Sequence, residues 1–312
     1  MTPVRRQRLD VDLVRRGLAT TRQAAQDAIA AHRVLVGGAV ALRASRLVAP
    51  SEPVEILGPR PRFVSRGGTK LDAALERFAV DVDGATVLDV GASTGGFADC
   101  LLSRGAAVVI AVDVGHGQLD ARLVADPRVV LLERTNVRSV TPRSLADAAG
   151  EACVPVAAVT ADLSFISLTT AMGVIAGPVV RSGGHLVLLV KPQFEVGRVE
   201  ASRAKGVIRD PSLWLSALGN VASSLESHGA VIIDAMCSPI TGASGNTEFF
   251  VHALAHAVPV PDAPLGAPSE AASRVLTDVV VSVPSPPAPA TTSGARSTSP
   301  STGPSTGPQD AG

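Results

Sequence analysis

Short apolar segments alternate with helical segments from about residue 67 onward, and this alternation restricts the fold more than any other feature. The predicted helices cover residues 96–103, 142–149, 167–177 and 212–228. The predicted strands cover residues 86–89, 108–112, 129–132, 156–161, 185–190, 230–237 and 249–254. Near-continuous apolar strands that alternate with helices are typical of a parallel sheet covered on both faces. The sequence therefore predicts a doubly wound α/β domain.

Charged residues end four of the predicted strands. They are Asp89, Asp113, Asp162 and Lys191. In open α/β sheets, ligands bind in the crevice beyond the carboxyl ends of the strands. Charges with no role beyond solubility would be scattered over helix faces and loops instead. The placement of these four residues therefore predicts a ligand site at this edge of the sheet.

The turn after the first of these strands is built from small residues, with the sequence DVGASTGGF over residues 89–97. Small residues let the backbone approach a ligand, and the helix that follows offers unpaired N–H groups. The glycines at 91, 95 and 96 do not match the G-x-G-x-x-G spacing of a pyrophosphate site. This spacing favours S-adenosylmethionine over NAD, while Asp113 can accept hydrogen bonds from the ribose of either cofactor.

The net charge of zero over 312 residues conceals an uneven distribution. Residues 1–66 hold 12 Arg against five acidic residues, which gives +7, and the remainder carries −7. Within the basic part, helical spacing over 9–19 and 21–32, a Gly-Gly hairpin over 34–42 and a strand over 53–57 predict a small α+β module. Its charge predicts a polyanionic partner.

Composition changes divide the chain into four parts. We expect the basic module over residues 1–60, a stiff interdomain linker over 61–66 and the α/β domain over 67–258. Residues 259–312 hold 11 of the 23 prolines, mixed with Ser, Thr, Ala and Gly. Such a composition buries too little apolar surface to offset its chain entropy. It predicts a disordered tail without chemistry.

Several protein classes are disfavoured by what the sequence lacks. The three cysteines, Cys100, Cys153 and Cys237, are far apart and form no CxxC pair, which disfavours a zinc site and a disulfide framework. No apolar run approaches the roughly 18 residues of a membrane helix, and the Arg-rich N-terminus lacks the apolar core of a signal peptide. We expect a cytoplasmic monomer with no metal and no membrane partner.

Lysine is rare in this chain. It has 25 Arg but only Lys70, Lys191 and Lys205. Arg stays protonated in proteins, whereas burial can tune a Lys amine. On this count alone, a codon bias toward Arg is the simpler explanation. Neighbouring strands would nevertheless bring Lys191 and Asp162 together above one crevice, whereas Lys70 and Glu248 taken singly would fit plain surface charges.

Seven segments together resemble the TlyA-type ribosomal RNA methyltransferases, which are related to the FtsJ class of ribose 2′-O-methyltransferases. The resemblance extends from about residue 5 to 256, through SRGGTKL, DVGASTGGF, DVGHGQL, ERTN, ADLSFISL, VKPQFE and SGNTEFF. It implies a Rossmann-like sheet that uses S-adenosylmethionine, preceded by an α-L RNA-binding domain. It also implies methylation of ribose 2′-hydroxyl groups in ribosomal RNA or ribosomal subunits, on cytidines of the small subunit and also of the large one.

The resemblance implies roles for individual residues. The catalytic tetrad would be Lys70, Asp162, Lys191 and Glu248, with Lys191 as the general base. Cofactor contacts would come from Asp89, Gly91, Ser93, Thr94, Gly95, Gly96, Phe97, Asp113, Asn136 and Asp162. RNA contacts would come from Arg6, Arg8, Arg22 and Arg43. Two of the three lysines belong to this tetrad, which argues against chance as the reason for their presence. His116 and the loop 197–210 depart from the family pattern.

Other functions stay open at this point. One is a membrane-damaging haemolysin, a label that the family has also carried, although the chain lacks a signal peptide, a membrane span and a strongly amphipathic cationic helix. Another is an RNA-binding protein that has lost catalysis, against which the complete tetrad argues. An NAD dehydrogenase is disfavoured by the glycine spacing. The sequence names neither the modified nucleotide nor the state of the RNA substrate.

Overall fold

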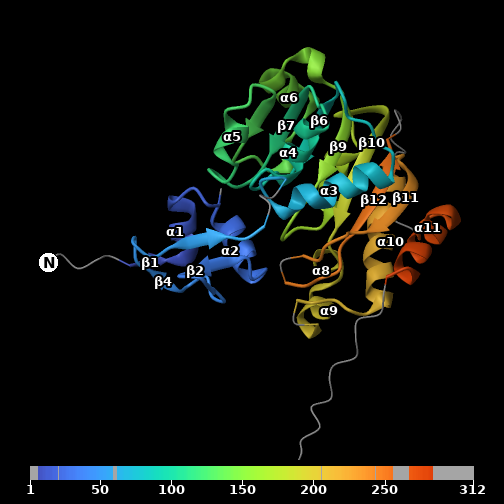
Figure 1. Cartoon of the computed structure of the whole chain (residues 1–312). Coiled ribbons are helices and arrows are strands. Elements are labelled where there is room, and N and C mark those ends of the chain that lie inside the picture. Colours follow the sequence, from blue (N-terminus) through green and yellow to red (C-terminus); the bar gives the residue numbers. More distant parts are fainter. Residues whose placement is uncertain are drawn as a thin grey trace, which may run out of the picture.

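The computed structural model describes residues 6–19, 21–58, 62–204, 206–242, 244–255 and 267–283. These residues form a small N-terminal domain and a larger α/β domain, which lie side by side (Figure 1). Their hydrophobic cores are separate clusters, one in the small domain and two in the large one.

The N-terminal domain packs two helices against two small antiparallel sheets. The helices are α1 (Leu9–Arg15) and α2 (Arg22–Ala30); the strands are β1 (Gln7–Arg8), β2 (Val34–Val36), β3 (Ala39–Val40), β4 (Leu47–Val48) and β5 (Val54–Ile56). The predicted hairpin turn is confirmed, because Gly37 and Gly38 have φ angles of 60° and 80°. Thr21 caps α2, with its hydroxyl oxygen accepting a hydrogen bond from the Ala24 N–H.

The large domain is built on a seven-stranded sheet in the order β11-β12-β10-β9-β6-β7-β8. Its strands are β6 (Thr86–Val90), β7 (Val108–Val112), β8 (Val129–Leu132), β9 (Val156–Ala161), β10 (Val180–Val190), β11 (Val231–Cys237) and β12 (Phe249–Leu254). Five neighbouring strands, β10, β9, β6, β7 and β8, are parallel to one another. The strand β12 runs antiparallel to both of its neighbours, β10 and β11. The α/β fold class is therefore confirmed. Six predicted strands match within one residue at each end, while β10 begins five residues earlier than expected.

Helices cover both faces of this sheet. The α-helices are α3 (Arg66–Arg77), α4 (Gly96–Ser103), α5 (Ala121–Val124), α6 (Pro142–Ala149), α7 (Met172–Ile175), α8 (Pro192–Glu195), α9 (Arg198–Arg203), α10 (Pro211–Ser227) and α11 (Glu270–Val281). Short 3-10 helices cover Val137–Ser139, Glu151–Cys153 and Leu168–Ala171. Successive strand residues face opposite cores, as β pleating requires: Leu88 packs with the cluster that holds Trp214, and Val87 with the cluster that holds Leu71.

The short helices α5, α8 and α9 were not expected from the sequence, and neither were two helices of twelve residues. The first is α3, which crosses one face of the sheet (Figure 1) and packs against α4. The two helix starts approach closely, since a Cβ at Gly68 would lie 2.8 Å from the Gly96 carbonyl oxygen. Phe63 and Val64 lie inside the expected linker 61–66, but they are buried in the hydrophobic cluster of the large domain that holds Leu71. This part of the segment therefore belongs to the large domain.

The second unexpected helix corrects the prediction of a disordered tail over 259–312. Within that range, α11 packs against β11 and α10. Its buried residues are Ala272, Leu276, Val279 and Val280, a spacing that forms one apolar face. The prediction is wrong for this helix because an average over a Pro/Ser-rich segment hides a short periodic stretch. The other residues expected to be disordered, 259–266 and 284–312, lie outside the described residues.

Candidate active site

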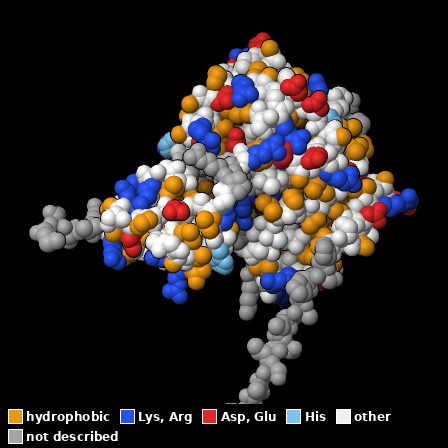
Figure 2. All heavy atoms as spheres, in the orientation of Figure 1, with side chains coloured by type: hydrophobic (Ala, Val, Ile, Leu, Met, Phe, Trp, Pro, Cys, Tyr) orange, Lys and Arg blue, Asp and Glu red, His pale blue; other side chains and the backbone are white. Residues whose placement is uncertain are grey.

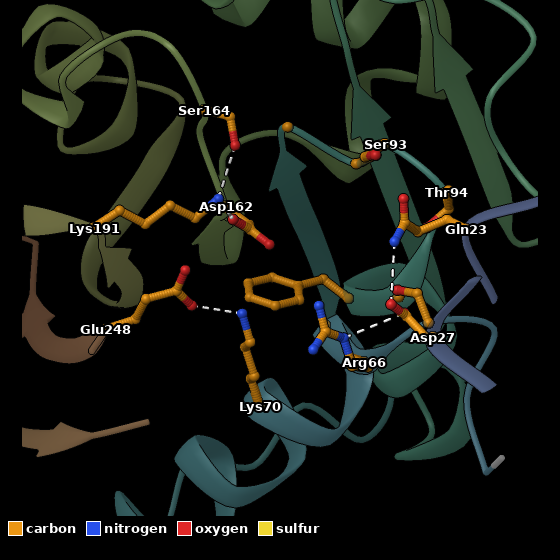
Figure 3. Close-up of a pocket in the computed structure, with 16 residues that line it drawn as sticks. Gln23, Asp27, Arg66, Lys70, Ser93, Thr94, Asp162, Ser164, Lys191 and Glu248 are labelled. Carbon is orange, nitrogen blue, oxygen red and sulfur yellow. Dashed lines mark hydrogen bonds and ion pairs between the residues drawn. The ribbon is translucent and has the colours of Figure 1, made fainter. Parts of the chain in front are cut away.

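The four expected tetrad residues meet at one edge of the sheet (Figure 3). Asp162 follows β9 and Lys191 follows β10, which are neighbouring parallel strands. Glu248 precedes β12, and because β12 is antiparallel to β10, with Phe249 opposite Val190, it reaches the same edge. Lys70 comes from α3. All four line one cavity of about 340 Å³.

The tetrad forms two ion pairs. The Lys70 ammonium nitrogen lies 2.5 Å from Glu248 Oε2, and these side chains are only 9% and 3% exposed. The Lys191 ammonium nitrogen lies 2.5 Å from Asp162 Oδ1 and donates a hydrogen bond to Ser164 Oγ at 2.8 Å. Removing paired charges from water is costly, so such a cluster is weak evidence for stability alone. It suits a site where charge and protons must be controlled.

The loop that carries Glu248 is fixed by a neighbouring amide. Asn246 is buried, accepts a hydrogen bond from the Ile208 N–H and donates one to the Gly206 carbonyl oxygen. Its side chain therefore binds the backbone of the 206–208 segment, and it does not line the cavity. Within SGNTEFF, the asparagine supports the loop and the glutamate enters the site.

A second cavity of about 460 Å³ lies beyond the carboxyl ends of β6, β7 and β9. Its lining includes Val90, Gly91, Ser93, Asp113, Gly115, Gln118, Asn136, Val137, Asp162, Leu163, Ser164 and Phe165. Four residues line both cavities: Gly91, Ser93, Asp162 and Ser164. The two cavities are therefore adjacent, and Asp162 of the tetrad lies where they meet.

Asp113 organises the wall of the second cavity. Its Oδ2 accepts a hydrogen bond from the Ser93 N–H at 2.8 Å, and its Oδ1 accepts one from the Gly115 N–H at 2.6 Å. The glycine-rich turn approaches closely on the other side, because a Cβ at Gly91 would lie 2.6 Å from the Asp162 carbonyl oxygen. Glu133 accepts hydrogen bonds from His116 and the Gly117 N–H, which hold the pKa of Glu133 below its ordinary value.

Most of the expected cofactor residues line one of these cavities. Gly91, Ser93, Thr94, Gly96, Phe97, Asp113, Asn136 and Asp162 do so. Asp89 and Gly95 line neither. The strand β6 extends one residue further than expected. Asp89 therefore lies inside the strand, and its side chain is completely buried. Gly95 is the left-handed residue before α4, where a Cβ would collide with Leu123.

The structure adds residues from the N-terminal domain that the sequence did not indicate. Gln23 and Asp27 of α2 line the tetrad cavity together with Arg66 (Figure 3). Arg66 Nε lies 3.2 Å from Asp27 Oδ2, and Gln23 donates to Asp27 Oδ1 at 3.1 Å. Arg66 stands one helical turn before Lys70, so its position was a usable signal. Gln23 and Asp27 gave none, because their place depends on how the domains dock.

The expected RNA-binding arginines divide into two groups. Arg8 and Arg22 bind the buried Asp10 carboxylate, with contacts of 2.9–3.0 Å. Burial raises the pKa of Asp10, but hydrogen bonds from Arg8, Gln26 and Arg22 outweigh this effect and lower it. Arg6 and Arg43 are exposed, and no ion pair is found for them within the described ranges. Figure 2 shows basic side chains of the N-terminal domain, all of them arginines, spread over its visible face.

The helices of the described residues include none long and apolar enough to cross a membrane. Within the same residues, no group of three or more His, Cys, Asp or Glu side chains is arranged to hold a metal ion.

Comparison with known proteins identifies both domains. The family model for FtsJ-like methyltransferases matches residues 63–254, and the S4 domain model matches residues 7–54. The 16S/23S rRNA (cytidine-2′-O)-methyltransferase TlyA of Mycobacterium tuberculosis is 44% identical over 79% of this chain and 89% of its own length. Hemolysin A of Brachyspira hyodysenteriae is 37% identical over 78% of this chain and 98% of its own.

A solved structure described as a hemolysin from Streptococcus thermophilus has a TM-score of 0.66 and 32% identity. The similarity covers 88% of this chain and 96% of that one. The two family models and the identity to relatives over most of the chain agree with the seven motifs and with the sheet order. The chain belongs to the FtsJ-like methyltransferase family, with an S4 domain preceding the methyltransferase domain.

Proposed function

We propose that this protein transfers a methyl group from S-adenosylmethionine to the ribose 2′-hydroxyl of cytidines in ribosomal RNA. The observation that carries the proposal is the meeting of the Lys70–Glu248 and Lys191–Asp162 pairs beside a second, adjacent cavity. The name of the M. tuberculosis relative supports the choice of cytidine and of both ribosomal subunits. Ribosomal RNA as substrate supports a cytoplasmic location, and a tetrad completed within one chain supports a monomer.

The second cavity fits S-adenosylmethionine. The turn at Gly91 lies so close to the Asp162 backbone that a Cβ would not fit there. Without a Cβ, the backbone of the turn can border a ligand. Asp113 presents a carboxylate suited to a ribose diol, and Asn136, in the loop after β8, lines the same cavity. When bound, the cofactor supplies an electrophilic methyl group on a sulfonium. Gly91, Ser93, Asp113 and Asn136 would hold it.

Lys191 carries the proton transfer in this proposal. A ribose hydroxyl is a poor nucleophile until its proton is removed, and Lys191 Nζ accepts that proton as the oxygen attacks the methyl group. Asp162 and Glu248 hold the two amines in place, since each is ion-paired with one of them. Lys70 adds a positive charge to the same cavity.

The N-terminal domain would hold the RNA. Its exposed arginines can contact phosphates, and A-form RNA is recognised largely through shape and backbone. The alternative of an RNA-binding protein without catalysis does not account for four charged side chains that meet beside a second cavity. The haemolysin alternative rests on the names of two relatives and gives this cavity no use.

Replacing Lys191 tests the proposal. For Lys191→Ala we expect methyl transfer to fall by about 10²–10⁴-fold, the usual contribution of a general base. RNA and cofactor affinity should stay within about threefold of wild type, because the phosphate contacts and the second cavity are intact. The measurement is incorporation of labelled methyl groups into ribosomal RNA, with mapping of 2′-O-methylated cytidines.

Lys191→Arg is the matched control. It keeps the positive charge next to Asp162 but cannot accept a proton. We expect this variant to be inactive as well, which separates proton transfer from simple charge. Turnover within tenfold of wild type in Lys191→Ala would exclude Lys191 as the base, and methylation confined to bases would exclude ribose as the acceptor.

A further inference from the structure

We propose that Ser164 is a positioning residue, whose hydroxyl fixes the direction in which Lys191 accepts the ribose proton. This inference rests on the proposed function. Ser164 lies two residues after Asp162, in the loop that follows β9. It lines both cavities, and so it stands at the border where cofactor and acceptor would meet.

Ser164 makes the directional contact on the Lys191 amine. The hydrogen bond from Lys191 Nζ to Ser164 Oγ is 2.8 Å long. Asp162 Oδ1 is closer, at 2.5 Å, but its contact has ion-pair distance without hydrogen-bond angles. An ion pair attracts without fixing rotation about the Cε–Nζ bond, whereas a hydrogen bond weakens steeply as its angle departs from linear. Within the described part of the chain, the serine therefore sets the rotation of this amine.

Rotation matters because the neutral amine has one lone pair. In that form, two N–H bonds and the lone pair take three tetrahedral directions around Nζ. With one N–H on Ser164 and the other drawn toward Asp162, the lone pair has a single direction left. Lys191 lines the tetrad cavity, and we place the acceptor hydroxyl in this direction. Fixed orientation of a base relative to its proton is a large part of enzymatic acceleration.

The loop that carries Ser164 is itself held against the segment after Lys191. Glu195, at the end of α8, accepts hydrogen bonds from the Ser167 hydroxyl and from the Leu168 N–H. The rings of Phe165 and Phe194 also contact each other, with centroids 5.6 Å apart. These contacts hold the segment that carries Ser164 against the segment that carries Lys191. The hydrogen bond between the two side chains therefore has a defined geometry.

Ser164→Ala tests the inference. We expect kcat for methyl transfer to fall by about 10–100-fold at neutral pH, because a misplaced catalytic group costs up to that much. KM for RNA and the affinity for S-adenosylmethionine should stay within twofold. Ser164→Thr keeps the hydroxyl and should recover most of the missing rate. Calorimetry with S-adenosylmethionine and single-turnover kinetics on ribosomal RNA supply these values.

The pH dependence gives a readout that a structural role would not move. A hydroxyl that accepts from the ammonium stabilises its protonated form, so its removal should move the acidic limb of the rate profile to lower pH, by about half a unit to one unit. The charged groups that line the same cavity, Asp162, Glu248, Lys70, Arg66 and Asp27, are unchanged in the variant. They should therefore contribute equally to both profiles.

Two results would overturn the inference. One is a Ser164→Ala enzyme with wild-type kcat and an unmoved acidic limb. The other is an unchanged kcat with weakened S-adenosylmethionine binding, which would make Ser164 a cofactor-binding residue instead. Either result, found while Lys191→Ala is inactive, would leave the proposed function standing. Activity retained in Lys191→Ala would remove the proposed function itself.

Discussion

Asp89 is the residue whose expected role and observed place differ most. Its side chain is completely buried in β6, and its Oδ1 accepts a hydrogen bond from the Thr160 hydroxyl on β9. The pKa of Asp89 is raised to about 7, mainly by burial; the nearby charges of Asp162 and Asp113 act in the same direction, and the Thr160 bond acts against them. The carboxyl group therefore titrates near neutrality inside the sheet.

Asp89→Asn should change how stability depends on pH. Since the folded pKa lies above the ordinary value of 3.8, the folded protein keeps its proton between about pH 4 and 7 while the unfolded chain loses it. Wild-type stability from this group therefore falls as pH rises, by up to about 1.4 kcal/mol per pH unit. Urea unfolding at pH 5 and pH 8 should show the variant gaining stability relative to wild type.

The difference between the two proteins isolates this carboxyl group, because all other titrating groups are shared. Asn can still accept from Thr160, so packing is conserved. Parallel stability curves for wild type and variant between pH 5 and pH 8 would contradict the assignment of a raised pKa to Asp89.

The Asp162–Lys191 pair could be predicted from the strand pattern, and Lys70 and Glu248 only from the family resemblance. The surroundings of these four residues could not be predicted. Asp162 and Lys191 directly follow apolar strands, and sheet geometry alone gathers such residues at one edge. Asp89 misled because the strand extends one residue further than its apolar run suggested. The hydrogen bond of Ser164 depends on side-chain rotamers, which no spacing encodes. The approach of Asp27 depends on domain docking.

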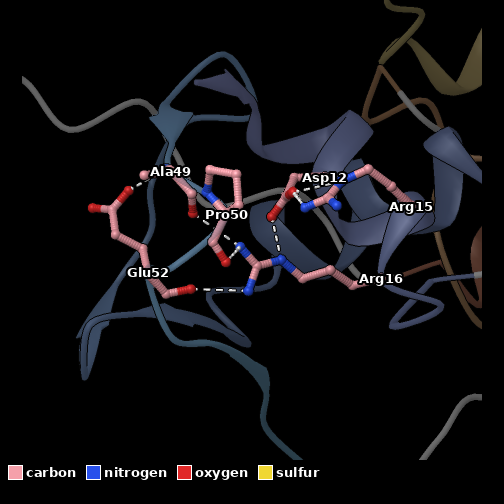
Figure 4. A network of polar contacts seen from close by, with 6 residues as sticks. All are labelled: Asp12, Arg15, Arg16, Ala49, Pro50 and Glu52. Atoms are coloured by element: carbon pink, nitrogen blue, oxygen red, sulfur yellow. Dashed lines mark hydrogen bonds and ion pairs between the residues drawn. The ribbon is translucent and has the colours of Figure 1, made fainter. Parts of the chain in front are cut away.

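At the scale of elements, the C-terminal end of α1 shows that arginines of the basic N-terminal domain can serve its packing as well as its charge. Asp12 is buried and binds both Arg15 and Arg16 (Figure 4). Arg16 also donates to the carbonyl oxygens of Glu52 and Ala49 at 2.9 and 3.1 Å. It is 20% exposed, against 48% for Arg15. Arg16 therefore fastens α1 to the segment before β5.

Arg16→Gln and Arg15→Gln form a matched pair, since each removes one positive charge from the same helix. We expect Arg16→Gln to destabilise the N-terminal domain by about 1–3 kcal/mol, because it frees partly buried carbonyl groups and part of the buried Asp12 carboxylate. Arg15→Gln should cost less than about 1 kcal/mol, as for an exposed ion pair. Hydrogen exchange of the amides in α1 and β5 measures both changes within this domain.

Equal protection of these amides in the two variants would show that Arg16 is only another surface charge. Salt-dependent RNA binding serves as the control, because both variants lose the same charge and stay folded under native conditions.

The strands were easier to predict than the helices at the domain edges. In β6, β7 and β9, a continuous apolar run between polar turns marks where each strand begins and ends. The helix α3 was missed because it begins at Arg66-Gly67-Gly68, and glycine is a poor helix former. Tertiary packing decides there: only glycine allows α3 to approach α4 so closely.

The whole molecule divides its tasks unequally between two domains. Among the described residues, the second cavity is lined by positions between 90 and 166, all in the large domain. The tetrad cavity takes Gln23 and Asp27 from the N-terminal domain as well. The basic charge is concentrated in the first 66 residues. Cofactor binding should therefore survive removal of the N-terminal domain, whereas methyl transfer to RNA should not.

A chain that begins at Arg62 tests this division. It keeps Phe63 and Val64, which pack in the large domain, and removes α1, α2 and their strands. We expect S-adenosylmethionine affinity within about threefold of wild type. RNA affinity should fall, and the slope of log K against log salt should flatten by roughly 0.7–0.9 for each RNA phosphate that the arginines no longer neutralise. Calorimetry and binding titrations over a range of salt concentrations provide the comparison.

The salt slope separates two explanations of the weakened binding. If the arginines of the N-terminal domain bind phosphates, their removal reduces counterion release, so affinity and slope fall together. If that domain only completes the wall of the tetrad cavity with Gln23 and Asp27, the RNA affinity falls while the salt slope stays unchanged. A chain that no longer binds the cofactor would instead mean that the large domain does not keep its fold alone. An unchanged slope would thus refute phosphate recognition by this domain and leave its +7 charge without an RNA partner.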